Sequence, residues 1–309
     1  MNRLAGIVVA VIGFLIAILS VLKVVPGITG PGVALILLGA LIIGLSFVNK
    51  PDTEGTERMP TPATLSNIFF SPGEVFSNLR SHPRWLVAVL IMSILAAVFS
   101  NLFLYRLGAE RVANFAIDKT LEMPMIQNNE QARQGVEASR PQAIADATNP
   151  VVRTGQAVSS FVGLTYLVAF LGLVFFLFAL VMGGKINYWQ AFSAAVYAMF
   201  PVAVIRFVLN TIILFLKDPT EIHPITGQSN LVQDNLNFLF TPSEHPVLYS
   251  IAGMIGLLSF YWIWLNATGL NKAAEKAPSS YGWTATLAVY FLGMALAAIA
   301  AMLFPSFIS

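Results

Sequence analysis

The sequence predicts an all-α polytopic membrane protein with about seven transmembrane helices. Of its residues, 57% are hydrophobic and 10% are charged, whereas soluble domains average about 45–50% and about 25%. The apolar residues form seven runs that reach or approach the roughly 20 residues a helix needs to cross a bilayer. These runs cover approximately residues 4–22, 32–48, 85–104, 158–182, 191–216, 247–267 and 285–304.

The first two runs predict an N-terminal transmembrane hairpin over residues 1–49. Residues 26–32, which join the runs, are rich in proline and glycine and indicate a tight turn. Gly39 and Gly44 lie in the second run, where small residues favour close packing of two helices; the favoured alternative is that they have no such role, because glycine is common in membrane helices. This run is short, so a tilted or partly interfacial helix is an alternative to a full span.

Residues 50–67 are rich in proline, threonine and glutamate and predict a flexible linker. A membrane domain with the remaining five spans follows over residues 68–309. Its longest hydrophilic loop, residues 105–155, is expected outside the cytoplasm. In that loop the third span is expected to continue as a helix through Leu121, and residues 127–138 predict a second, polar helix.

A short amphipathic helix is expected near residues 72–81, before the third span. Ser71, Pro72 and Glu74 follow the sequence pattern of a capping box with proline at the first helical position. We expect the helix to lie on the cytoplasmic membrane surface. The alternative is a helix packed on its own protein. In either case one face carries the apolar side chains Val75, Phe76 and Leu79.

Charge and tryptophan positions both orient the spans. Short loops on the side of the N-terminus carry more Lys and Arg than the short loops opposite, which favours a cytoplasmic N-terminus. The tryptophans would all lie near that same interface, where indole rings prefer to sit. They are Trp85, Trp189, Trp262, Trp264 and Trp283. We therefore expect a plasma (prokaryotic cytoplasmic) membrane protein with its N-terminus inside and its C-terminus outside.

Three segments, taken in order, resemble the Yip domain family (Ypt-interacting proteins) in its prokaryotic form, over about residues 68–304. They are residues 70–76 with 83–85, residues 182–185 with Trp189, Phe192 and Pro201, and residues 262–265 with 269–270. The resemblance implies a five-helix membrane domain with a cytoplasmic N-terminal side. It implies no settled activity, and GTPase binding is not carried over because the aspartate-leucine-tyrosine-glycine-proline box of eukaryotic relatives is missing.

Arg206 is the only charged residue inside the seven runs. A charge near mid-bilayer is costly and marks a candidate functional site. Asn210 lies one helical turn further on, and Pro201 is expected to bend the helix and free a carbonyl group. These three residues could form a polar cleft for an anion or a lipid headgroup. The alternative is an arginine that bonds backbone carbonyls and fixes helix packing.

Gly183, Gly184 and Lys185, part of the Yip-like pattern, do not form a phosphate-binding loop. The Walker pattern needs another upstream glycine, a Ser or Thr after the lysine, and a preceding strand. We interpret the glycines as a helix stop and a tight turn. The three histidines are scattered through loops, and the chain has no cysteine. No catalytic residue, metal site or cofactor is therefore expected.

These observations favour a protein without catalytic activity that organises or shapes the membrane or binds other membrane proteins. Its expected partners are the lipid bilayer and other membrane proteins. Nucleic acid is not expected as a partner, because the net charge is only +2. The alternative function is a transporter or lipid-handling permease that uses the polar cleft around Arg206. The sequence does not identify a small-molecule ligand.

Overall fold

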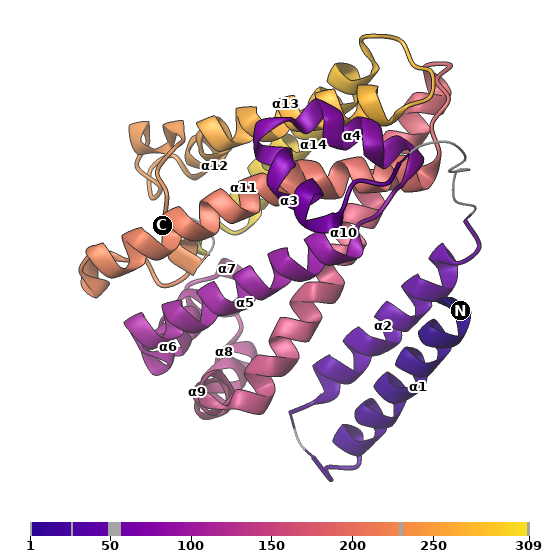
Figure 1. Cartoon of the computed structure of the whole chain (residues 1–309). Coiled ribbons are helices and arrows are strands. Elements are labelled where there is room, and N and C mark those ends of the chain that lie inside the picture. The colour runs from indigo at the N-terminus through magenta and orange to yellow at the C-terminus, as the bar shows by residue number, and fades with distance from the viewer. Residues whose placement is uncertain (1, 26, 49–56, 229–230, 308–309) are drawn as a thin grey trace. The chain divides into compact units, whose positions relative to one another are not determined.

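The structure is a computed structural model that describes residues 2–25, 27–48, 57–228 and 231–307. Every regular element within these ranges is a helix (Figure 1). Four of the described helices are long and apolar enough to cross a membrane. They are α5 (Leu86–Leu107), α10 (Pro150–Val181), α11 (Tyr188–Leu216) and α14 (Tyr281–Leu303). The protein is thus an all-helical membrane protein, as predicted.

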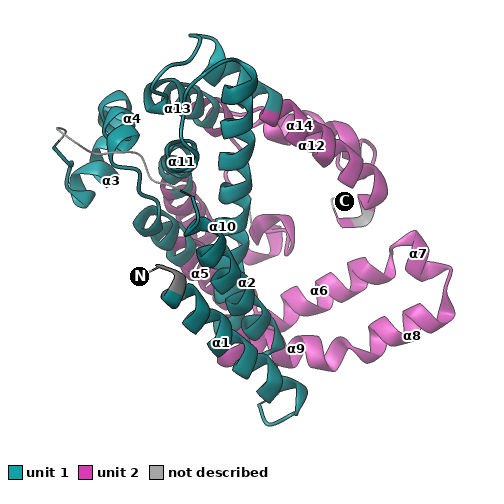
Figure 2. Cartoon of the chain, turned by 90° about the vertical axis from the view of Figure 1, so that its right-hand side faces the viewer, with its two compact units in different colours: residues 1–94, 154–203, 262–288 teal, residues 95–153, 204–261, 289–309 magenta. Residues whose placement is uncertain are grey.

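Two compact units divide the chain, and each contains three stretches of sequence (Figure 2). Unit 1 comprises residues 1–94, 154–203 and 262–288. Unit 2 comprises residues 95–153, 204–261 and 289–309. All five tryptophans belong to unit 1.

The N-terminal hairpin of unit 1 consists of α1 (Asn2–Val21) and α2 (Thr29–Leu45), which lie side by side (Figure 1). Glycines let the two backbones approach. A Cβ on Gly39 would lie 2.5 Å from the carbonyl oxygen of Gly6 and 2.6 Å from the Cβ of Ala10. The predicted packing role of Gly39 is confirmed. Gly44 has no such role among the described residues, because a Cβ there would meet no atom within 4 Å.

Two short helices of unit 1, α3 (Thr61–Phe70) and α4 (Pro72–Ser81), precede the third apolar run. The flexible linker expected over residues 50–67 is therefore helical from Thr61 onward, while residues 50–56 lie outside the described residues. Pro60 and Pro62 fit the start of α3, since proline is favoured at the first positions of a helix.

Helix α4 forms where it was predicted, but without the predicted capping box. Ser71 is its N-cap residue, yet the Ser71 side chain makes no capping hydrogen bond. The apolar face packs inside the protein, because the side chains of Val75, Phe76 and Leu79 are fully buried. This face packs partly against α13 (Leu257–Ala273). The ring of Phe76 lies so close to Gly269 of α13 that a Cβ on Gly269 would be 2.7 Å from it. The protein itself thus covers this face, so α4 does not place these side chains in the membrane as an interfacial helix would; the alternative of a helix packed on its own protein fits.

In unit 2 the expected extension of the third span stops at Gly108, whose φ of +87° ends the helix. The loop then forms four separate helices. The sequence predicts only two helical segments here, an extension of the third span and one polar helix. The four helices are α6 (Ala109–Leu121), α7 (Pro124–Gln127), α8 (Glu130–Ala138) and α9 (Arg140–Thr148). Arg140 ties α9 to α6, because its Nη2 lies 2.7 Å from Oδ1 of Asp118.

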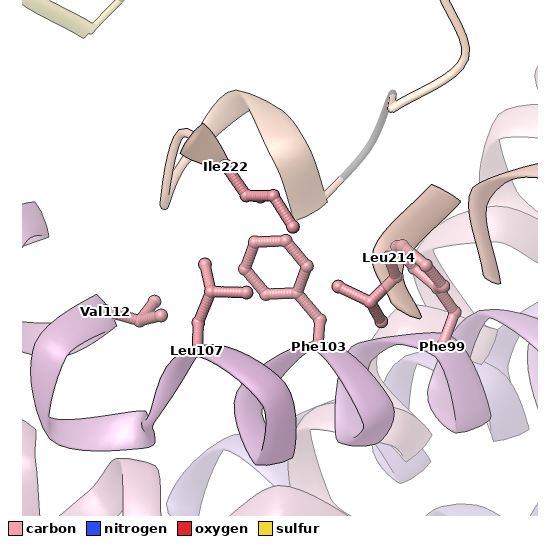
Figure 3. Packing of buried hydrophobic residues seen from close by; sticks show 6 residues of the cluster. All are labelled: Phe99, Phe103, Leu107, Val112, Leu214 and Ile222. Atoms are coloured by element: carbon pink, nitrogen blue, oxygen red, sulfur yellow. The ribbon is translucent and has the colours of Figure 1, made fainter. Parts of the chain in front are cut away.

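A buried apolar cluster in unit 2 holds the start of this loop against the end of α11 (Figure 3). Phe103, Leu214 and Ile222 are its most buried members, and Phe103 points between the other two. Two arginines reinforce the contact. Arg106 Nη2 donates to the carbonyl of Lys217 (3.3 Å), and Arg111 Nη1 donates to that of Pro219 (3.0 Å).

The sixth apolar run was predicted as one span, but it forms two helices, α12 (Pro246–Met254) and α13. Between them, Gly256 pairs with Asn235 in an isolated β-bridge. The carboxylate of Asp234 accepts a hydrogen bond from the N–H of Leu258 (2.8 Å). A loop segment thus inserts at the break and supplies partners for the interrupted helix backbone. The total of seven spans stays a prediction.

Among the described residues, three short 3₁₀ helices lie in the loop between α11 and α12, and a fourth follows α14. They are η1 (Pro219–Glu221), η2 (Thr226–Gln228), η3 (Leu236–Leu239) and η4 (Pro305–Phe307).

Candidate functional site

The connection between α10 and α11 is a tight turn, as the sequence predicted. Gly183 has a φ of +71°, and the N–H of Gly184 donates to the carbonyl of Ala179 (2.7 Å). This is the geometry of a glycine helix stop. A Cβ on Gly184 would also approach the carbonyl of Lys276 to 3.2 Å, so glycine allows a second chain segment to lie alongside.

That second segment is the connection between α13 and α14. Lys185 and Lys276 form an antiparallel bridge, with the N–H of Lys185 2.5 Å from the carbonyl oxygen of Lys276. The Lys185 Nζ also lies 2.8 Å from Oε2 of Glu275, and this ion pair raises the pKa of Lys185. Both connections were predicted on the same side of the membrane, and their contact agrees with that assignment.

Two side-chain hydrogen bonds cap the start of helix α11. The side chain of Asn187 accepts from the N–H of Trp189 (2.9 Å), and the side chain of Gln190 accepts from the N–H of Asn187 (2.6 Å). Gln190 is 1% exposed, and its Nε2 also donates to the carbonyl of Arg80 (2.8 Å). One buried amide therefore joins the start of α11 to the end of α4.

We call this part of unit 1 the platform: α3, α4, and the connections at residues 182–187 and 274–280. It carries two neighbouring aromatic side chains at the end of α3, Phe69 and Phe70, whose ring centroids lie 6.5 Å apart. Phe69 packs against Phe200, with ring centroids 6.1 Å apart, whereas Phe70 is 85% exposed. Sequence reasoning missed Gln190, although Asn187 and Gln190 have capping-box spacing.

Arg84 lies beside the platform, between α4 and α5. Its Nη2 donates to Oδ1 of Asn78 (3.1 Å), but its Nε and Nη1 atoms are buried and have no hydrogen-bond partner within the described chain. Burial lowers the pKa of Arg84, Tyr197 opposes this shift, and Arg58 adds to it. Sequence reasoning missed Arg84 as a candidate, because arginine is common next to a span.

Helix α11 carries the residues of the predicted polar cleft. It is continuous through Pro201, which is buried. Arg206, in unit 2, is partly buried, and its Nε has no hydrogen-bond partner among the described residues. Asn210 is 3% exposed, and its Oδ1 accepts from the N–H groups of Leu231 and Val232, both at 3.0 Å. The Asn210 side-chain oxygen thus holds a loop of the protein.

The sequence model of the Yip1 domain matches residues 66–304. The chain belongs to the Yip1 domain family. The match starts within α3 and ends just after α14, and it includes the platform from residue 66 onward. Comparisons with curated proteins and with solved structures gave no match.

The hairpin lies outside the matched Yip1 domain but contacts it within unit 1. The Trp189 Nε1 donates to the carbonyl of Val48 (2.9 Å), and the Tyr166 hydroxyl donates to that of Leu37 (2.7 Å). Between the hairpin and the Yip1 domain is a cavity of about 510 Å³. Its walls are mainly apolar and are formed by Leu45, Val48, Ala169, Leu173, Phe176, Ile186, Asn187 and Tyr188.

Proposed function

We propose that this Yip1-domain protein organises a prokaryotic cytoplasmic membrane by binding other membrane proteins, without catalysing a reaction. The platform supports this proposal best. Buried contacts fix it at several points, among them the Gln190 amide and the Phe76 ring against Gly269. A preorganised surface binds with a smaller entropic cost than a mobile one.

The exposure of the Phe70 side chain is the observation that carries the proposal. Phe70 ends α3 and is 85% exposed, while its neighbour Phe69 is anchored on Phe200. Exposed aromatic side chains on a rigid support are frequent centres of protein–protein binding energy. In this proposal the platform faces the cytoplasm, the N-terminus is inside and the C-terminus is outside.

Copurification tests this function. The full chain is solubilised from its own membranes, and stoichiometric partners are identified and quantified for the wild type, Phe70→Ala and Ser66→Ala. Ser66 is also exposed on α3, so it serves as the matched control. We expect Phe70→Ala to lose most of a partner that Ser66→Ala retains. Equal partner recovery from both variants would place the binding surface elsewhere.

A permease is the second candidate function, and the orphaned Nε of Arg206 favours it. A buried charged donor without an acceptor suits a transient anionic or lipid ligand. The test is solute or lipid flux in proteoliposomes containing the wild type or Arg206→Leu. Flux that the substitution abolishes would defeat the organiser proposal. A stoichiometric partner together with no flux would defeat the permease.

A further inference from the structure

Arg84 carries a partly buried positive charge that no carboxylate neutralises in the portion of the chain the structure describes. Asn78 satisfies the Nη2 donor, and the Nε and Nη1 donors are buried without an acceptor. Leaving a buried charged donor unpaired destabilises a protein. An acceptor from outside the chain would remove this cost.

Two further sources of positive potential lie near the guanidinium group of Arg84. Arg58 lies near enough to disfavour the charged form of Arg84. Helix α5 starts at Leu86, two residues after Arg84, and its first turn contains no acidic residue. The N-terminus of a helix carries a partial positive charge, which attracts anions. All three features therefore favour an anionic ligand.

Capping of α4 does not explain the whole arrangement. A cation near the end of a helix interacts favourably with its free carbonyl groups, and Arg84 does contact Asn78 in the last turns of α4. That contact uses one nitrogen of the guanidinium. The Nε and Nη1 donors remain without a partner.

We propose that Arg84 and the N-terminus of α5 bind the phosphodiester group of a membrane phospholipid. Phosphate oxygens accept several hydrogen bonds at once and suit the guanidinium group. The depth also fits, because Arg84 immediately precedes a span and is followed by Trp85, a residue type common at headgroup level.

Binding requires a small local opening. The carbonyl of Glu57 accepts from Asn78 Nδ2 (2.9 Å), and the N–H of Met59 donates to Asn78 Oδ1 (3.3 Å). These bonds hold residues 57–59 beside the same side chain that contacts Arg84. The lipid phosphate reaches Nε and Nη1 when this segment moves aside. The site does not depend on whether the platform binds another protein.

The test measures lipid-dependent thermal stability of the delipidated full chain in neutral detergent. Phosphatidylglycerol, a phosphate-free diacylglycerol glycolipid and sodium phosphate are titrated separately into the wild type, Arg84→Gln and Arg80→Gln. Arg80 is a matched control, because its exposed side chain lies on the last turn of α4 and carries the same charge.

We expect phosphatidylglycerol to stabilise the wild type and Arg80→Gln at similar concentrations. Arg84→Gln should need about 10–100 times more lipid, the factor that corresponds to losing hydrogen bonds to a charged group. Without lipid, Arg84→Gln should be at least as stable as the wild type, because it no longer buries an unneutralised charge.

Several results would overturn the proposal. One is an equal response of Arg84→Gln and the wild type to phosphatidylglycerol. Another is an equal effect of the glycolipid on the wild type, which would show that the acyl chains alone are recognised. Full stabilisation by sodium phosphate would identify a soluble anion instead. Unfolding of lipid-free Arg84→Gln would make Arg84 a structural residue.

Discussion

The fifth apolar run contains a proline and forms one helix, whereas the sixth contains no proline and forms two. Helix α11 continues through Pro201 from Tyr188 to Leu216. The sixth run breaks at Ile255 and Gly256, where the carbonyl and carboxylate of Asp234 accept from the N–H groups of Leu257 and Leu258. A helix in an apolar environment can be interrupted where other groups satisfy its backbone. The partners of the backbone, and not the presence of proline, therefore distinguish the interrupted run from the continuous one.

The largest expected effect comes from Gly256→Val. A Cβ at this position would lie 2.8 Å from the carbonyl oxygen of Asp234 and 3.0 Å from the Cβ of Asn235, so the inserted loop must shift. We expect the free energy of unfolding in mixed micelles to fall by about 3 kcal/mol.

Gly253→Ala is the control for this substitution. A Cβ at Gly253 would meet only Asn237, at 3.8 Å and beyond. Stability should be unchanged or slightly improved, because alanine favours a helix more than glycine does. Similar losses from both substitutions would mean that the inserted loop is not the cause.

Asn210→Ala should have the next largest effect. The substitution leaves the N–H groups of Leu231 and Val232 without their acceptor, upstream of the inserted loop. We expect a loss of about 2 kcal/mol in the free energy of unfolding. Hydrogen exchange of these two amides should accelerate. Unchanged exchange would show that the loop is held without Asn210.

Asp234→Ala should cost less, about 1 kcal/mol, because it removes one side-chain bond near the start of α13 while the backbone bond to Leu257 can persist. Faster exchange of the Leu258 amide would check this effect. Gln233→Ala changes an exposed neighbour and should leave that amide protected. If both variants behaved alike, the carboxylate would have no specific role at the break.

Pro201→Ala should have the smallest effect, within about 1 kcal/mol of the wild type. The substitution restores an N–H that can join the helix, which offsets the lost burial of the proline ring. Circular dichroism should show unchanged helix content. A large loss of stability would mean that the ring, rather than the helix backbone, holds this part of α11.

Local sequence signals predicted the features that depend on local structure. Helix α4 and the stop at Gly183 both follow from proline, glycine and apolar spacing, whereas α2 begins at Thr29, inside the turn predicted over residues 26–32. The break at Gly256 was not predictable in this way, because its partner Asn235 lies about twenty positions earlier and the run itself contains no proline or charged residue. Hydropathy measures transfer to lipid, and it carries no information about the partners of individual backbone groups.

Two similar sequence patterns show the same limit at a smaller scale. Ser71 and Glu74 have capping-box spacing, but the Ser71 side chain makes no cap, whereas the side chains of Asn187 and Gln190 both accept backbone hydrogen bonds at the start of α11. The Gln190 amide also reaches Arg80, so a distant part of the chain helps to hold it in place. Arg206 was found because a charge inside a span is conspicuous. Arg84 was missed because the lack of acceptors for its Nε and Nη1 atoms follows from their burial, which the sequence does not show.

The bond between Gln190 and Arg80 also sets an order for biosynthesis. The two residues are 110 positions apart in the chain. At typical translation rates, Gln190 is synthesised roughly 5–20 s after Arg80, so the carbonyl of Arg80 lacks this hydrogen-bond donor during that time. During that interval α4 exists without the segment that later fixes its end. The nascent chain therefore passes through a stage in which an insertion factor or chaperone could bind α4.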